Sequence, residues 1–222
     1  MPDVAKGKPE GICVTADGRV LVADTHYSQV ICFSPASEIL WKSGHYGTGD
    51  GEFIYPIAIT VDDQGRIYVA EYGGQDRVQQ FTADGTFIRS WGKLGSEPGE
   101  FQRPSGLTWM PTGELVVADA VNHRLQVFDG EGQFHRILGG PGTGPGQFHY
   151  PYDVSFYDGK LYVIEYGGQR LQVLSPQGDS LLRLGQGGRG DGCFAGPWKL
   201  NASALGVFIS DTNNHRVVRV RQ

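Results

Sequence analysis

Short runs of alternating apolar and polar residues follow one another along the whole chain. In the first stretch they span residues 11–14, 19–22, 29–33 and 38–41. An alternation with a period of two is typical of β-strands, because successive side chains point to opposite faces of a sheet. The turns between the first two runs of successive stretches contain Gly18, Gly65, Gly113 and Gly159. Since glycine readily adopts the positive φ of tight turns, the pattern predicts antiparallel sheets of four strands and no helix.

Two markers show that these runs belong to a repeat. The first marker is a proline, at Pro9, Pro56, Pro104, Pro151 and Pro197, with separations of 47, 48, 47 and 46 residues. The second is a Gly-x-Phe corner before four of these prolines, ending at Phe53, Phe101, Phe148 and Phe194. Four strands in a period of this length are typical of one blade of a β-propeller. A single sheet cannot bury both of its faces, so we expect the repeats to stack on one another.

The recurring aromatic residues have a structural interpretation. We expect the four corner phenylalanines, together with Trp41 and Trp91 of the fourth strands, to fill the space between neighbouring sheets. Large rings bury much apolar area at such contacts, and a ligand role at every repeat is not needed to explain them.

An acid and an arginine recur where the second strand of a repeat ends and the third begins. The pairs are Asp119 and Arg124, Glu165 and Arg170, Asp211 and Arg216, and, one residue further apart, Glu71 and Arg77. This spacing lets the two side chains face each other across a hairpin, where a guanidinium matches a carboxylate. We interpret the pairs as structural clasps, with a charged functional ring as the alternative. The first repeat departs from the pattern, because Asp24 faces Gln29.

The sequence Asn-His-Arg occurs twice in these hairpins, at residues 122–124 and 214–216. Together with the proline, the corner, the turn glycine and the acid–arginine pair, it resembles the NHL repeat family over residues 8–222. The resemblance implies an all-β fold, a β-propeller of five NHL-type four-stranded blades in one domain over residues 1–222. The repeat units cover about residues 8–53, 54–101, 102–148, 149–194 and 195–222.

The last repeat is incomplete in the sequence. It contains three expected strands, at residues 199–202, 206–210 and 216–221. An uncovered edge strand needs a partner or protection. NHL-like propellers usually have six blades. We favour a five-bladed ring and keep an open six-bladed ring, and one completed by another chain, as alternatives, so monomer and oligomer are both left open.

Variable residues at one end of the blades are the candidates for function. The residues after each proline and those in the loop between the second and third strands belong to this end, and loops are where function varies. The candidate ligand-binding residues are Glu10, His26, Tyr27, Tyr72, Tyr152, Asp153, Tyr166, Trp198 and Lys199. We expect Glu10, the two residues after Pro151 and the two residues after Pro197 to line the mouth of a central channel. These last four residues are Tyr152, Asp153, Trp198 and Lys199. A structural alternative exists for Tyr72 and Tyr166, since each is followed by Gly-Gly-Gln.

Aromatic anchors beside a few charges suit a peptide, a protein or a small polar ligand. The leading hypothesis is therefore a non-enzymatic binding or scaffold propeller. The alternative is a propeller enzyme, a lyase or a lactonase- or hydrolase-like protein, with a metal or an acid in the central channel. For the latter, Glu10 and Asp153 are the available acids.

The resemblance also bears on a metal site. In the amidating lyase that some NHL proteins resemble, zinc-binding histidines directly follow the repeat prolines, and here no such proline is followed by histidine. His123 and His215 occupy equivalent hairpin positions, and we interpret them as loop histidines. We predict no catalytic residue, no metal site and no cofactor, and leave the question of an enzyme open.

Composition limits the partners. The formal net charge is −5 and the basic residues are scattered, so we expect no nucleic acid as partner. No apolar run is long enough to span a bilayer, and residues 1–8 lack the apolar core of a signal peptide, so we expect a soluble protein that does not act on membranes, of unknown compartment. Cys13, Cys32 and Cys193 lack metal-site spacing, and we interpret them as free thiols.

Overall fold

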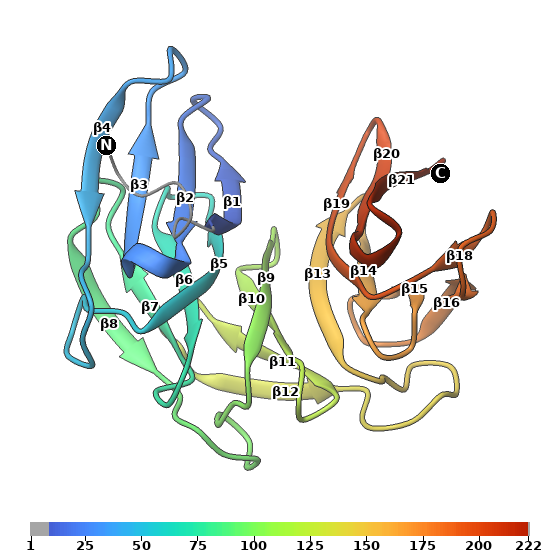
Figure 1. Cartoon of the computed structure of the whole chain (residues 1–222). Helices are drawn as coiled ribbons and strands as arrows, with labels where there is room; N and C mark the ends of the chain where they lie inside the picture. Colours follow the sequence, from blue (N-terminus) through green and yellow to red (C-terminus); the bar gives the residue numbers. More distant parts are fainter. Residues whose placement is uncertain (1–8, 222) are drawn as a thin grey trace. The chain divides into compact units, whose positions relative to one another are not determined.

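The structure, a computed structural model, describes residues 9–221. The chain divides into two compact units, of which the first ends at Gly113 and the second begins at Glu114 (Figure 1). Each unit is described by itself. Strands account for nearly all regular structure in the described residues, as the alternating pattern predicts.

Unit 1 contains the first two repeats and the beginning of the third. Blade 1 is an antiparallel sheet of β1 (Pro9–Val14), β2 (Val20–Asp24), β3 (Gln29–Phe33) and β4 (Ile39–Ser43), in that order. Blade 2 has the same order in β5 (Tyr55–Val61), β6 (Ile67–Tyr72), β7 (Arg77–Phe81) and β8 (Phe87–Trp91). Strand β9 (Pro104–Met110) completes the unit and packs against β5 and β6.

Unit 2 contains the rest of the third repeat and the last two repeats. Its first sheet has β10 (Glu114–Asp119), β11 (Arg124–Asp129) and β12 (Phe134–Leu138). Blade 4 consists of β13 (Pro151–Tyr157), β14 (Lys160–Glu165), β15 (Arg170–Leu174) and β16 (Ser180–Leu184). A short parallel pair, β17 (Gln186–Gly187) and β18 (Cys193–Phe194), leads to blade 5, with β19 (Pro197–Ser203), β20 (Gly206–Asp211) and β21 (Arg216–Val220).

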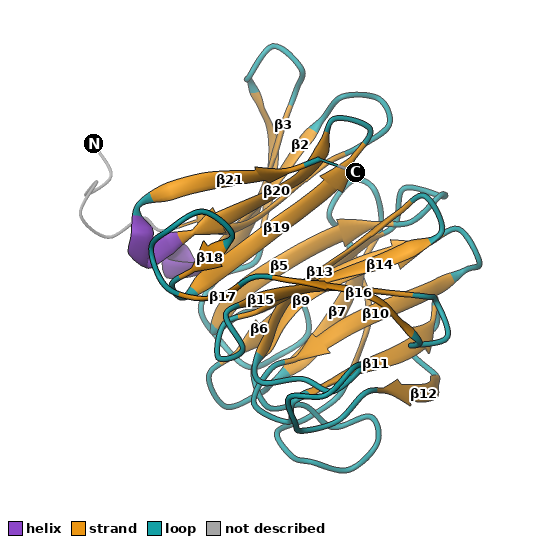
Figure 2. Cartoon of the chain, turned by 90° about the vertical axis from the view of Figure 1, so that its right-hand side faces the viewer, coloured by secondary structure: helices purple, strands orange, loops and turns teal. Residues whose placement is uncertain are grey.

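The expectation of no helix is wrong in one detail. The loops between the second and third strands of blades 1 and 5 each form one turn of 3₁₀ helix, η1 (Thr25–Tyr27) and η2 (Thr212–Asn214), drawn purple in Figure 2. Each turn ends on a left-handed residue, Ser28 with φ 52° and His215 with φ 53°. A four-residue connection is short enough for one tight turn to satisfy its backbone groups. Neither helical turn is long or apolar enough to cross a membrane.

The cores lie between consecutive blades of each unit. In unit 1, the side chains that pack between blades 1 and 2 are Leu21, Ala23, Val30, Cys32, Phe53, Ile59, Ile67, Val69 and Phe81. In unit 2, blades 4 and 5 bury Tyr162, Ile164, Leu171, Val173, Phe194, Leu200, Ala202, Val207 and Ile209. Phe53 and Phe194 thus fill the space between sheets, as predicted, and all four corner phenylalanines are buried. Trp41 packs against the first core, and Trp91 lies edge-on to Tyr68.

These stacked four-stranded antiparallel sheets are the blades of a β-propeller, which confirms the predicted fold class. The expected strands of the last repeat are present, and the three cysteines are free thiols. The organisation of the chain as one domain stays a prediction.

Candidate functional site

The residue after the repeat proline lies in a β-bulge in four of the blades. The strand pairing shifts register between Pro9 and Gly11 in blade 1, and between Pro151 and Asp153 in blade 4. Corresponding shifts occur in blades 2 and 5. A bulge turns the extra side chain away from its regular direction. Glu10, Tyr152 and Trp198 therefore lie at one kind of position, at the end of the blade where the second strand runs into its loop.

In unit 2, three aromatic candidates come together. The ring of Tyr152 stacks on that of Tyr166 with a centroid distance of 4.7 Å, and Trp198 meets the two tyrosines edge-on at 5.0 Å and 5.8 Å. We call Tyr152, Tyr166 and Trp198 the aromatic cluster. Tyr152 is buried, whereas Tyr166 and Trp198 remain partly exposed. The cluster joins blades 4 and 5 and presents two aromatic rings to solvent.

A charged pair lies next to the cluster in the sequence and spans the same two blades. Lys199 Nζ is 4.0 Å from Asp153 Oδ1, and the backbone N–H of Leu200 donates to Asp153 Oδ2 at 3.0 Å. Burial raises the pKa of Asp153, while Lys199 and the backbone hydrogen bonds oppose this rise. The candidates of unit 2 thus form two groups, the aromatic cluster and this charged pair, and both groups join blades 4 and 5.

Gly196, which precedes Pro197, permits this arrangement. Its φ is 54°, and a Cβ placed there would lie 3.0 Å from the Tyr166 ring and 2.5 Å from Asn213 Nδ2. A larger residue would push the tyrosine away from blade 5.

Unit 1 presents a second, smaller set of candidates. The Tyr72 ring lies 5.3 Å from that of Tyr55, and the Arg103 guanidinium sits over Tyr72 at 4.9 Å. Burial raises the pKa of Tyr72; Arg103 lowers it and Glu10 raises it. Glu10 Oε2 is buried and accepts no hydrogen bond from the residues that the structure describes. The other two candidates of this unit, His26 and Tyr27, are exposed on η1.

Sequence reasoning missed the residues before the prolines. Arg103 and Tyr150 have φ values of 59° and 54°, and Tyr55 occupies the same position in blade 2. In unit 2, Tyr150 donates its N–H to His123 Nδ1 at 3.0 Å and packs edge-on against that ring. Burial lowers the pKa of His123, and the neighbouring His149 lowers it further. The sequence could have identified these residues, since each of them directly precedes a repeat proline, at the same end of the blade as the candidate residues.

The acid–arginine pairs form ion pairs within each hairpin. The Nε–oxygen distances are 2.7 Å for Arg77 and Glu71, 2.8 Å for Arg124 and Asp119, 2.6 Å for Arg170 and Glu165, and 2.8 Å for Arg216 and Asp211. In blade 1, Gln29 Nε2 donates to Asp24 at 3.1 Å instead.

The same arginines make a second set of bonds that the sequence did not suggest. Arg77 Nη2 donates to the carbonyls of Gly49 and Glu52 in the corner before blade 2, and Arg170 does the same for Thr143 and Gln147. Each pair therefore ties a hairpin to the preceding corner.

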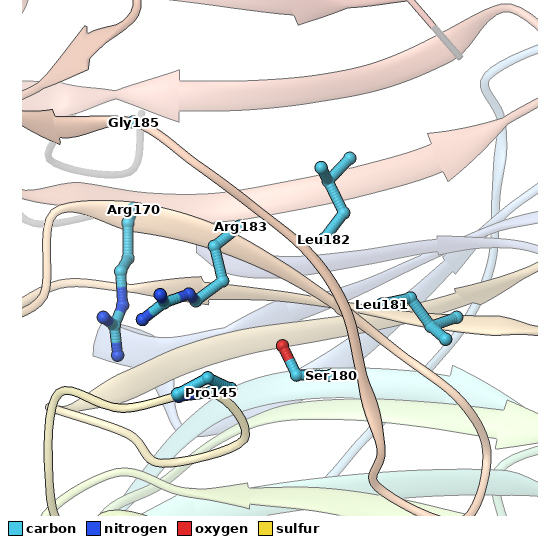
Figure 3. A pocket seen from close by; sticks show the side chains of 7 residues that line it. All are labelled: Pro145, Arg170, Ser180, Leu181, Leu182, Arg183 and Gly185. Atoms are coloured by element: carbon cyan, nitrogen blue, oxygen red, sulfur yellow. The ribbon is translucent and has the colours of Figure 1, made fainter.

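Two features of the described surface outside the candidate residues bear on a site. Between residues 9 and 221, no three His, Cys, Asp or Glu side chains are arranged to hold a metal ion. A shallow pocket of about 540 Å³ lies along β16, where Figure 3 shows Arg170 and Arg183 side by side near Pro145. Both guanidinium groups donate to the Thr143 carbonyl, and none of the nine candidates lines this pocket.

Comparison with known proteins gives a consistent picture of the repeat. The NHL repeat family model matches residues 7–33 and 101–128. Peptidyl-glycine alpha-amidating monooxygenase A of Xenopus laevis is 33% identical over 127 residues, which cover 53% of this chain and 14% of that protein. NHL repeat-containing protein 3 of Homo sapiens is 35% identical over 118 residues, or 51% of this chain and 33% of that protein. The matched segments thus span a third or less of these relatives.

Solved structures with the same fold are more distant in sequence. A streptogramin B lyase structure has a TM-score of 0.72 and 14% identity, over 99% of this chain and 67% of that one. A chain of a nidogen/laminin complex has a TM-score of 0.78 and 17% identity, over 98% of this chain and 77% of that one. At this level of identity the similarity establishes the fold alone.

Proposed function

Because the chain is an NHL-repeat β-propeller, we propose that it is a binding module that recognises a polypeptide segment through the aromatic cluster of unit 2. The observation that carries this proposal is the meeting of Tyr152, Tyr166 and Trp198 at the bulged end of blades 4 and 5. These side chains come from loops and strand ends, which tolerate variation more than the interblade core does.

The chemistry of the cluster suits a polypeptide. Tyrosine and tryptophan contribute large contact areas at a small cost in side-chain entropy, and they are enriched among the residues that dominate binding energy. Lys199 and Asp153 add a cation and a buried acid that can fix the orientation of peptide groups. A partly exposed cluster of this kind presents an anchor surface to an extended chain.

The name of one similar protein supports a polypeptide ligand. One sequence relative is a peptidyl-glycine alpha-amidating monooxygenase, whose name indicates that it acts on a peptide.

The test uses an immobilised random-peptide array as the probe. We expect the wild-type protein to bind a subset of peptides, and Trp198→Ala to weaken that binding at least about tenfold, as expected for a central aromatic anchor. Phe134→Ala is the matched control, because Phe134 is an exposed aromatic residue of unit 2 on β12. Binding that survives Trp198→Ala unchanged, or falls equally with Phe134→Ala, contradicts the proposal.

A second candidate function rests on the burial of Asp153. A buried carboxyl with a raised pKa beside a lysine is a candidate general acid. The streptogramin B lyase structure supplies a probe, since a streptogramin B can be incubated with the protein and its products followed by mass spectrometry. Conversion that Asp153→Asn abolishes, with the melting curve retained, supports an enzyme; no conversion leaves the binding proposal as the better account.

A further inference from the structure

The shallow pocket along β16 belongs wholly to unit 2. We call it the β16 pocket; it is lined by residues 180–183 of β16 together with Pro145, Arg170 and Gly185 (Figure 3). Blade 4, which carries β16, has neighbours from its own unit on both faces, the sheet of β10, β11 and β12 and blade 5. The surroundings of the pocket are therefore described by unit 2 alone.

Strand pairing sets Arg183 and Ser180 on the same face of blade 4. Arg183 pairs with Gln172, and Ser180 pairs with Leu174, which lies two residues further along β15. Residues two apart on a strand share a face, and directly paired residues point to the same side of a sheet. The pairing shifts register at this point and leaves Leu181 as an extra residue, which brings Ser180 to the face of Arg183.

The Arg183 guanidinium is held against the corner that precedes blade 4. Its Nη1 donates to the Thr143 carbonyl at 3.0 Å, and Nη1 of Arg170 donates to the same oxygen at 2.7 Å. Both guanidinium groups thus lie within hydrogen-bond distance of one atom, and Figure 3 shows them side by side. Two positive charges this close repel each other, so a negative charge beside them is favourable.

An acid balances the charge of Arg170 but not that of Arg183. Arg170 Nε lies 2.6 Å from Glu165 Oε1, and Nη2 donates to Oε2 of the same carboxylate at 3.3 Å. Arg183 is exposed, and no carboxylate between residues 9 and 221 forms an ion pair with it. A guanidinium has five N–H groups, of which the Thr143 carbonyl occupies one, so the others are available to a ligand.

The position of Arg183 is not basic in the two preceding repeats. Arg183 pairs with the glutamine that follows the hairpin arginine by two residues. The residue paired with the equivalent glutamine is Ser90 in blade 2 and Ile137 in β12. The arginine is therefore not part of the hydrogen bonding that the repeats share.

The corner before blade 4 differs from the preceding corners in the opposite sense. Its residue before the phenylalanine is Gln147, where the two preceding corners have Glu52 and Glu100. Gln147 Oε1 accepts from the Gly144 N–H at 3.0 Å, as the glutamate carboxylates accept from backbone N–H groups of their own corners. The structural bond is thus kept while the negative charge is absent. Blade 4 combines one acid fewer with one base more at a single place.

We propose that the β16 pocket binds an acidic side chain of a polypeptide, whose carboxylate pairs with Arg183. The planar guanidinium matches a carboxylate with two hydrogen bonds, and the Ser180 hydroxyl on the same face can donate a further one. One negative charge is sufficient, because Glu165 already balances Arg170. A phosphate, which carries a charge of about −1.5 to −2 at pH 7, brings more negative charge than Arg183 neutralises.

The remainder of the lining favours a polypeptide over a small carboxylic acid. Leu181 is 54% exposed and Pro145 is exposed, so both can cover apolar groups that flank the acid. Strand β16 is also the last strand of its sheet, and an extended segment can pair with the backbone of such an edge. The β16 pocket shares no residue with the aromatic cluster, so this proposal does not rest on binding at that cluster.

Fluorescence polarisation with the whole chain and a labelled peptide tests the proposal. The probe is a short end-blocked peptide in which glutamate and leucine alternate, used at low ionic strength, where exposed charges interact most strongly. We expect saturable binding with a dissociation constant below about 1 mM. Arg183→Gln should weaken this binding at least about tenfold, and so should glutamine in place of glutamate in the peptide, because either change removes the charged hydrogen bonds.

Arg136→Gln is the matched control. Arg136 also lies on the fourth strand of a repeat in unit 2, but it forms an ion pair with Glu114 and does not line the pocket. We expect this variant, and Trp198→Ala, to bind the glutamate peptide as the wild type does. Circular dichroism shows that each variant folds.

Four results would overturn the proposal. The first is no binding of the glutamate peptide at about 1 mM, and the second is binding that Arg183→Gln leaves intact. The third is an equal loss in Arg136→Gln or Trp198→Ala, which would place the peptide elsewhere. The fourth concerns the ligand: tighter binding of a phosphoserine peptide would assign the pocket to phosphate, and displacement by N-acetylglutamate with the affinity of the peptide would assign it to small carboxylic acids.

Discussion

Replacing Arg77 by methionine tests whether the acid–arginine pair holds blade 2 to its preceding corner. Arg77 is buried and donates to Glu71 Oε1 at 2.7 Å and to the carbonyls of Gly49 and Glu52. Methionine fills similar space but removes all three bonds. Glu71, which is fully buried, keeps only its bonds from the Ile54 N–H and Gln79.

The expected loss follows from the buried charge that remains. Removing one partner of a buried ion pair costs about 3–5 kcal/mol, mostly because the other charge is left uncompensated. This loss is a large fraction of the stability of an ordinary domain. The double variant Glu71→Gln/Arg77→Met leaves no charge behind, and we expect it to recover most of the loss. Arg19→Met, which removes an arginine paired with the exposed Asp17, is the control and should cost much less.

The loss should also depend on pH. Burial raises the pKa of Glu71 above its ordinary value of 4.5, although hydrogen bonds from Ile54 and Arg77 oppose this. A carboxyl with a raised folded pKa contributes stability below its unfolded pKa, and this contribution is lost as the pH rises through the folded pKa. Without Arg77 the folded pKa rises further, so Arg77→Met is penalised more at about pH 8 than at about pH 5.

Urea unfolding of the wild type, Arg77→Met, the double variant and Arg19→Met at both pH values measures these differences. A loss below about 1 kcal/mol for Arg77→Met, or an equal loss at both pH values, refutes the reasoning, since either result means that Glu71 is solvated when Arg77 is absent.

Three further changes test other parts of the structure. Phe148→Ala empties a fully buried corner position and should cost about 3–5 kcal/mol in urea unfolding, whereas Phe134→Ala, at an exposed position, should cost little. Gly92→Ala should lower the melting temperature, because Gly92 has φ +92° and its Cβ would lie 2.4 Å from the Phe101 ring; a normal melting curve contradicts this contact. Burial lowers the folded pKa of His123. The contribution of His123 to stability is therefore present above its unfolded pKa of about 6.5 and is lost as the pH falls. In urea unfolding between about pH 8 and pH 5, His123→Asn should lose less stability than the wild type, because the histidine that titrates is gone.

The strands and the repeat could be predicted from the sequence because both rest on local patterns. Alternation with a period of two fixes which side chains share a face, and the recurring proline and corner fix where each blade begins. Phe53 and Phe194 lie in interblade cores because they follow the same corner sequence. The 3₁₀ turns were not predicted, since a single helical turn in a hairpin loop leaves no periodic pattern of apolar residues in the sequence.

The candidate site could be predicted only in part. Proline spacing identifies the end of the blade where Tyr152 and Trp198 lie, but their contact with Tyr166 depends on how blades 4 and 5 pack. The contact of the Arg103 guanidinium with the Tyr72 ring was not predicted. Arg103 is the residue before the next repeat proline, and it lies in a loop that follows no periodic sequence pattern. Likewise, Arg77 donates to the carbonyls of Gly49 and Glu52, which lie before the first strand of the same blade. The sequence shows an arginine but does not show which distant backbone carbonyls accept its hydrogen bonds.

The bulge after four of the five repeat prolines explains how one architecture can present different side chains at the same end of its blades. Bulged side chains are not needed for the alternating interblade packing, because Ile59 and Leu200, further along the same strands, supply it. At the bulge itself, Ile57 is 1% exposed and buried in the fold, whereas Glu10 and Trp198 are partly exposed. The same backbone device therefore holds a core residue in one blade and a partly exposed acid or ring in others. Substitutions at Trp198 should accordingly alter the proposed peptide binding with little effect on stability, while substitutions at Ile57 should do the reverse, because Ile57 belongs to the buried interior and Trp198 does not.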